Sequence, residues 1–204
     1  AFWADVICIT IAFGILIMRI CIKITEEKKR IFDAEAVLDI GKRQIQANAY
    51  GLKRMNTGMM AILTAGEGRD YVGKVAALTT VRTFTKLYNQ YDSTQSPDNF
   101  FEKAFKLANT NVLNTLETGK AYAGCLILNR NILKYGIVGH MNVYVFRGKE
   151  LILLSKGQIM EELIKEKVNK GLLSKEAALR ISDINRAYNF VGRDDYMSPL
   201  VSSS

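Results

Sequence analysis

The residues after an apolar run at 59–63 have a spacing that can bind phosphate. Gly68, Gly73 and Lys74 reproduce the glycine, four residues and Gly-Lys of a nucleotide-binding loop. Val75 follows, where such a loop needs a hydroxyl to bind magnesium. The loop also needs a parallel sheet and a later apolar strand that ends in aspartate, but the apolar run at 132–139 ends at His140. The sequence therefore argues against a nucleotide site.

The order of the expected elements indicates an α+β protein. Apolar alternation and runs predict three early strands, then two long helices, four further strands and two shorter helices. Ser96 and Pro97 cap and open the second long helix, and Ser174 caps the last one. The expected ranges are strands at 36–41, 46–54 and 59–65, a helix at 71–91 and another from Pro97, strands at 121–128, 132–139, 142–147 and 150–154, and helices at 158–171 and 174–182. Strands in runs and helices in runs favour a layered sandwich over alternating βαβ units.

Several local signatures in this order resemble the metal-dependent serine/threonine protein phosphatases of the PPM, or type 2C, family. The resemblance runs from about residue 39 to about residue 196. Gly41 and Arg43 match an early Gly-x-Arg of the family. Gly66 and Gly73 match a glycine-rich turn and the start of the helix that follows it. The resemblance implies a layered αββα sandwich that is C-terminally incomplete, since the family's last aspartate-bearing strands have no counterpart here.

The chain departs from the family at the positions that bind metal. Ala47 and Asn48 stand where the family has an adjacent Glu-Asp, and Ala65 stands where it has the aspartate that bridges two metal ions. His140 replaces a later aspartate, and Gly157, followed by a glutamine, replaces an Asp-His pair. Gly66 keeps its place beside Ala65, so the resemblance implies a degenerate metal centre.

These substitutions bear on the chemistry that the resemblance implies. Enzymes of the family use manganese or magnesium, which prefer carboxylate oxygens, to generate a hydroxide that attacks the phosphate. Neither Ala47 nor Ala65 has a side-chain oxygen, and Asn48 offers only a neutral carbonyl. We therefore predict no metal cofactor and assign no catalytic residue. Arg43 matches the arginine that holds the substrate phosphate in the family, and is our candidate phosphate-binding residue.

The N-terminal region reads as a membrane anchor. Residues 6–24 are apolar except for Arg19 and Lys23, and a helix of about 20 apolar residues spans a bilayer. Basic residues lie in and behind the second half of this run, which places the following chain in the cytoplasm by the positive-inside rule. We predict a single-pass anchor at 1–24 in the cell membrane, a basic connector at 25–36 and a phosphatase-like domain at 37–204. The alternative for the apolar run is a buried core helix.

Composition excludes some other classes of protein. The net charge of +8 is spread along the chain without a dense basic block, which favours a surface beside anionic lipid over a nucleic-acid partner. Cys8, Cys21 and Cys125 show no Cys-x-x-Cys spacing, so neither a zinc site nor a disulfide framework is indicated.

The sequence predicts a membrane-anchored, cytoplasmic, phosphatase-like domain that is catalytically inactive. Its expected role is regulatory, through binding a phosphorylated protein or a signalling partner. Two other hypotheses stay open. The first is an active serine/threonine phosphatase with atypical metal ligands, and the second is a structural subunit of a membrane complex.

Overall fold

A computed structural model describes residues 15–19, 33–55, 58–68, 71–92, 94–129 and 132–203, in two compact units, 1–35 and 36–204. In the first unit, residues 15–19 are helical. The remainder of the predicted span at 6–24 lies outside the described residues, as does most of the connector at 25–36. Among the helices that are described, none is both long and apolar enough to cross a membrane.

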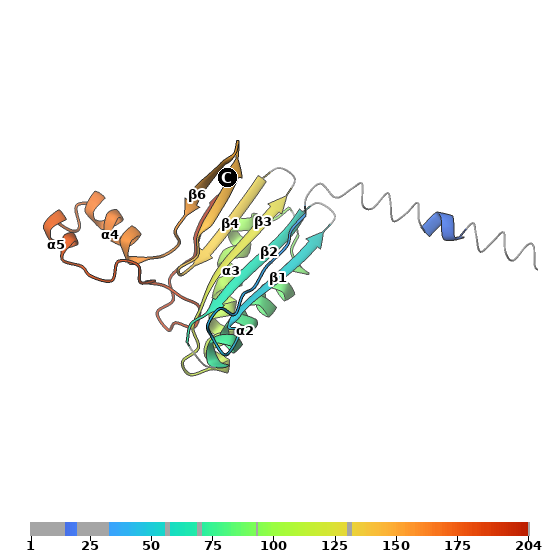
Figure 1. Cartoon of the computed structure of the whole chain (residues 1–204), viewed down its shortest axis with the longest axis horizontal. Coiled ribbons are helices and arrows are strands. Elements are labelled where there is room, and N and C mark those ends of the chain that lie inside the picture. Colours follow the sequence, from blue (N-terminus) through green and yellow to red (C-terminus); the bar gives the residue numbers. More distant parts are fainter. Residues whose placement is uncertain are drawn as a thin grey trace, which may run out of the picture. The chain divides into compact units, whose positions relative to one another are not determined.

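A five-stranded antiparallel sheet forms the centre of the second unit (Figure 1). Its strand order is β1-β2-β3-β4-β7, and all four pairings are antiparallel. The strands are β1 (Asn48–Met55), β2 (Gly58–Gly66), β3 (Ala121–Asn129), β4 (Ile132–Val138) and β7 (Leu200–Ser203). Since a nucleotide-binding loop requires a parallel sheet, the glycine loop at 68–74 is not one, as the sequence indicated.

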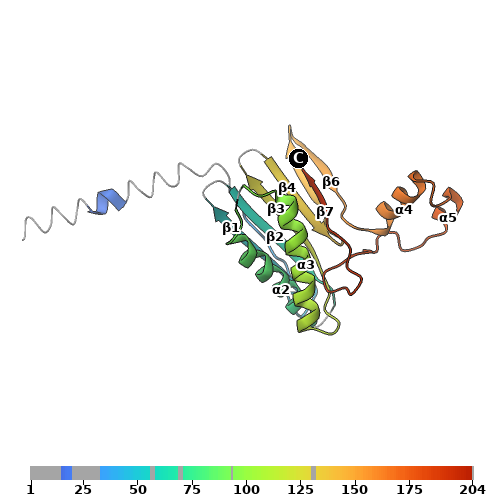
Figure 2. The ribbon, with the colours of Figure 1, turned by 180° about the vertical axis from the view of Figure 1, so that it is seen from behind.

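Two long helices, α2 (Tyr71–Tyr88) and α3 (Pro97–Thr115), cover one face of this sheet (Figures 1 and 2). The predicted start of α3 is confirmed, because Ser96 Oγ accepts a hydrogen bond of 3.3 Å from the Asp98 amide and Pro97 occupies the first turn. Helix α2 ends at Tyr88, three residues before the predicted end at 91.

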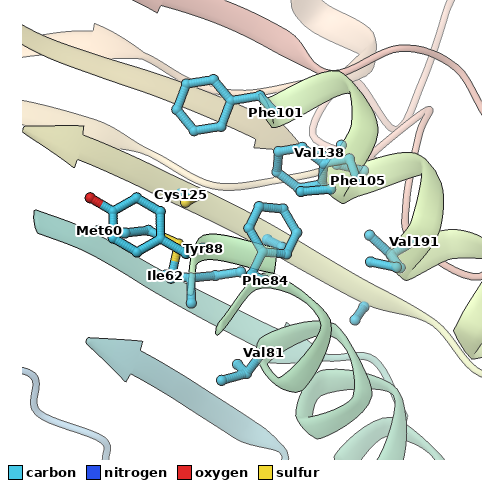
Figure 3. Close-up of a cluster of buried hydrophobic side chains, with 14 of the residues drawn as sticks. Met60, Ile62, Val81, Phe84, Tyr88, Phe101, Phe105, Cys125, Val138 and Val191 are labelled. Carbon is cyan, nitrogen blue, oxygen red and sulfur yellow. The ribbon is translucent and has the colours of Figure 1, made fainter. Parts of the chain in front are cut away.

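The core lies between the helices and the sheet (Figure 3). Alternate residues of β2 and β3 point into it, as the pleat of a strand requires. Phe84 of α2 is fully buried, and its ring meets those of Phe105 and Phe100 edge-on, with centroids 4.7 and 6.1 Å apart. Cys125 of β3 is buried here, and burial raises the pKa of its thiol, so it is an inert core residue.

The remaining strands form a separate two-stranded sheet, β5 (Val143–Arg147) and β6 (Glu150–Ser155). The predicted hairpin turn is confirmed, with φ of +59° at Gly148 and +72° at Lys149, the conformation of a tight primed turn. Helices α4 (Met160–Asn169) and α5 (Lys175–Leu179) follow and contact each other. Ser174 caps α5 as predicted, accepting a hydrogen bond of 3.1 Å from the Ala177 amide.

The structure shows the predicted α+β fold with an antiparallel sheet, and it adds detail to the predicted layers and strands. In the described residues the long helices form a layer on one face of the sheet, and the second sheet consists only of the β5–β6 hairpin. The predicted strand at 36–41 is irregular chain, with Val37 90% exposed and Gly41 in a turn at φ +58°. An alternating run becomes a strand only where another strand pairs with it. Conversely, β7 pairs with β4 although its sequence, "LVSS", gave no signal.

Candidate functional site

Four of the predicted site positions meet at one end of the sheet. Asn48 of β1 pairs with Ala65 of β2, which pairs with Tyr122 of β3, so the three side chains adjoin on one face of the sheet. This face is the one opposite α2 and α3. Together with Arg43 and Gly66, these residues line a cavity of about 410 Å³, which we call the Arg43 cavity.

The two other predicted positions lie elsewhere. Ala47 is 2% exposed and does not line the cavity, but its carbonyl accepts a hydrogen bond of 2.9 Å from the amide of Gly66, which does. Gly157 is buried against Gly139, whose carbonyl oxygen would lie 2.3 Å from any added Cβ. The next residue, Gln158, is also buried. Its Nε2 donates a hydrogen bond of 2.8 Å to the Ser198 carbonyl, and its Oε1 accepts one of 2.9 Å from Asn189 Nδ2. Gln158 has a structural role here.

The glycines that carry part of the family resemblance have a packing function. A Cβ on Gly66 would lie 2.0 Å from the Gly73 carbonyl oxygen, and a Cβ on Gly73 would lie 2.6 Å from that of Glu67. The end of β2 and the first turn of α2 can approach this closely only without side chains. Lys74, the lysine of the glycine loop, instead places its Nζ 5.1 Å from the centroid of the Tyr71 ring.

Arg43 lies at the end of β2, where its Nη1 donates a hydrogen bond of 3.5 Å to the Gly66 carbonyl. This bond uses one of the five N–H donors of the guanidinium. The side chain is otherwise exposed and lines the cavity. Its position allows the fork geometry by which arginine binds a phosphate through two parallel hydrogen bonds.

Sequence reasoning missed two carboxylates that also line the Arg43 cavity, those of Asp39 and Glu67. The Glu67 amide donates a hydrogen bond of 3.0 Å to the Lys120 carbonyl, and Glu67 Oε2 accepts one of 2.8 Å from the Tyr122 hydroxyl. Burial, and then this contact with Glu67, raise the pKa of Tyr122, so the phenol stays protonated and donates. The partner residue Tyr122 is 55 positions away, and no local pattern reveals it.

The donors in this cavity do not fit a two-metal centre. Asp39 and Glu67 supply two carboxylates, Asn48 supplies a neutral carboxamide, and Ala65 supplies nothing at the position between the strands. Two divalent ions of the manganese or magnesium kind need several anionic oxygens. In the described part of the chain no cluster of three or more histidine, cysteine, aspartate or glutamate side chains could hold a metal ion. The predicted lack of a metal cofactor stays a prediction.

Solved structures with the same architecture are serine/threonine phosphatases. The S. agalactiae serine/threonine phosphatase superposes with a TM-score of 0.68 at 17% identity, over 82% of this chain and 72% of that one. Stp1 from Staphylococcus aureus gives 0.65 at 15% identity, over 86% and 74%. The catalytic domain of PstP in complex with 2 manganese ions gives 0.57 at 16% identity, over 84% and 69%. The sequence itself matches no family model and no curated protein.

The chain has the PPM-type phosphatase fold. The resemblance seen in the sequence is thereby confirmed at the level of the fold. The PPM-type fold places Asn48, Ala65 and Gly66 together at the end of a strand pair. At such low sequence identity, the structural similarity shows the architecture alone. Activity depends on the residues of the cavity.

Proposed function

We propose that this domain binds phosphorylated protein at the Arg43 cavity and does not hydrolyse it. One observation carries the proposal. The cavity keeps the guanidinium of Arg43 beside Gly66, while Asn48 and Ala65 give it no anionic oxygen between the strands. Binding a phosphate requires only cations and N–H donors, whereas hydrolysis also requires an activated nucleophile.

The available groups make a poor hydrolytic site for a physical reason. Phosphate-monoester hydrolysis is among the slowest uncatalysed reactions, so an enzyme must supply strong charge stabilisation. Of the lining groups, the Tyr122 phenol is protonated and Glu67 is already hydrogen-bonded to it. A single arginine can orient the phosphate but cannot generate hydroxide.

One observation favours the alternative of an active phosphatase. Asp39 and Glu67 bring two carboxylates to the cavity, with the amide oxygens of Gln46 and Asn48 beside them. Such a set of oxygen donors could hold one hard cation. The proposed location at the membrane rests on the apolar run at 6–24 alone. The hypothesis of a structural subunit stays a prediction from the sequence.

The full chain is expected to show no hydrolysis of a phosphoserine peptide above buffer in millimolar manganese. Its melting temperature should also stay unchanged, whereas an ion bound at a hundredfold excess over Kd would add ~2.7 kcal/mol, or about 5–10 °C for a domain of this size. Both are measured with and without a chelator. Turnover that the chelator abolishes, and that Glu67→Gln also abolishes, would establish the active-phosphatase alternative.

Arg43→Gln is expected to weaken binding of the phosphorylated partner peptide about tenfold or more, because a hydrogen bond to a charged group contributes ~1.5–3 kcal/mol. The measurement is titration of the full chain with a fluorescent phosphopeptide and its unphosphorylated counterpart. Lys42→Gln is the matched control, since Lys42 is exposed and adjacent but does not line the cavity. Equal weakening by both variants would show that the effect is general charge attraction and not a site at Arg43.

A further inference from the structure

A second, larger cavity of about 690 Å³ adjoins the first, and Glu67 and Tyr122 line both. We call it the Phe190 cavity. Its other walls come from the start of α4, from the end of α5 and from the irregular chain between α5 and β7. Four basic side chains line it, those of Lys120, Arg180, Arg186 and Arg193. A volume of this size suits a small organic ligand.

The wall that follows α5 is fixed to the body of the domain. Asn109 of α3 is 6% exposed, accepts hydrogen bonds of 2.7 and 2.9 Å from the Gly192 and Arg193 amides, and donates one of 2.9 Å to the Arg193 carbonyl. Val191 exchanges two backbone hydrogen bonds with Ala121, of 3.0 and 2.9 Å. A buried side-chain amide that makes three hydrogen bonds holds its partners in one geometry. The cavity is therefore a built feature of the fold.

The basic residues of this cavity divide into one that is neutralised and three that are not. Arg193 forms a two-pronged ion pair with Asp195, and its Nη1 also donates to the Tyr188 carbonyl. Within the part of the chain that the structure describes, no carboxylate pairs with the remaining basic side chains, which are Lys120, Arg180 and Arg186. The cavity therefore presents cations with which an anionic ligand can form ion pairs.

The remaining lining sets the chemistry of that ligand. Lys120 Nζ lies 4.9 Å from the centroid of the Phe190 ring, and the Arg193 guanidinium lies 5.7 Å from it, so positive charge gathers at one aromatic residue. Apolar and aromatic side chains form much of the rest, including Met160, Leu163, Phe190 and Met197. Two carboxylates also line the cavity, that of Glu67, which accepts a hydrogen bond from the Tyr122 hydroxyl, and that of Asp183.

We propose that the Phe190 cavity binds a phosphate monoester with an apolar or aromatic organic group. A phosphate monoester carries about −1.5 to −2 charges at neutral pH, and its oxygens can accept charge-assisted hydrogen bonds from the three unpaired cations, which outnumber the two lining carboxylates, those of Glu67 and Asp183. The organic group would contact the apolar wall while the phosphate meets Lys120 and Arg186. This site is separate from Arg43 and does not depend on whether the Arg43 cavity binds phosphoprotein or hydrolyses it.

The test is a titration of the isotope-labelled full chain with phenyl phosphate, followed by the NMR shifts of its backbone amides. We expect saturable shifts at Lys120, Phe190 and Val191. Lys120→Gln and Arg186→Gln should each raise the apparent Kd about tenfold or more. Arg82→Gln, which removes an exposed charge on α2 that does not line the cavity, should leave Kd unchanged.

The same titration separates this inference from the proposed function. If the shifts centre on Asn48 and Gly66, and Arg43→Gln abolishes them while Arg186→Gln does not, the ligand occupies the Arg43 cavity and the inference is wrong. If neither set of amides shifts in folded protein, the inference is also wrong. One further probe identifies the natural source. A phosphoserine peptide that binds more tightly than phenyl phosphate indicates a protein ligand, whereas tighter binding of phenyl phosphate indicates a small molecule.

Discussion

Gly66→Ala is expected to destabilise the domain strongly. The added Cβ would lie 2.0 Å from the Gly73 carbonyl oxygen and 2.9 Å from that of Ala47, and both are backbone atoms that cannot rotate away. The end of β2 and the start of α2 would have to separate, and Gly66 would lose its hydrogen bond to the Ala47 carbonyl. We expect a loss of about 3–5 kcal/mol or more in the free energy of unfolding, against a total stability of about 5–15 kcal/mol.

Urea denaturation followed by circular dichroism measures this loss, and Gly124→Ala is the matched control. Gly124 lies in β3 of the same sheet, and a Cβ there meets only the Met141 side chain, at 3.7 Å, an ordinary contact. We expect its free energy of unfolding to change by less than about 1 kcal/mol. If Gly66→Ala is as stable as Gly124→Ala, then β2 and α2 do not approach as the structure describes.

Phe84→Ala is expected to reduce the free energy of unfolding by about 3–5 kcal/mol. Phe84 is fully buried at the centre of the core, and Figure 3 shows its side chain between α2 and α3. Removing the ring leaves a cavity and deletes the edge contacts with Phe100 and Phe105. The same denaturation experiment measures the effect.

The control for this substitution is Phe146→Ala. Phe146 lies in β5 and is 71% exposed, so its ring buries little apolar area and its substitution loses little burial energy. We expect a change of about 0.5 kcal/mol or less. A loss at Phe146 as large as that at Phe84 would mean that the hairpin face is buried in solution, contrary to the structure.

Much of the fold was predictable because its signals are local. Helix periodicity, the Ser96 cap with Pro97 and the turn at 148–149 each depend on residues close in sequence, and each is confirmed within a few positions. Strand pairing is different, because it depends on partners far along the chain. The run at 36–41 therefore failed as a strand, and β7 formed against β4 without a sequence signal.

The candidate site divides in the same way. The sequence determined which chemical groups are present, including the arginine at 43 and the missing carboxylates at 47, 48 and 65. These are properties of side chains and need no coordinates. Only the tertiary structure decided which groups meet. It paired Ala65 with Tyr122 across 57 positions, placed Glu67 in the lining of the cavity and buried Ala47, which does not line it. It also placed Lys120, Arg180 and Arg186 around one cavity, although they are not close together in the sequence. Their positions depend on backbone pairing and on the hydrogen bonds of the buried Asn109 amide, which join residues far apart in the chain.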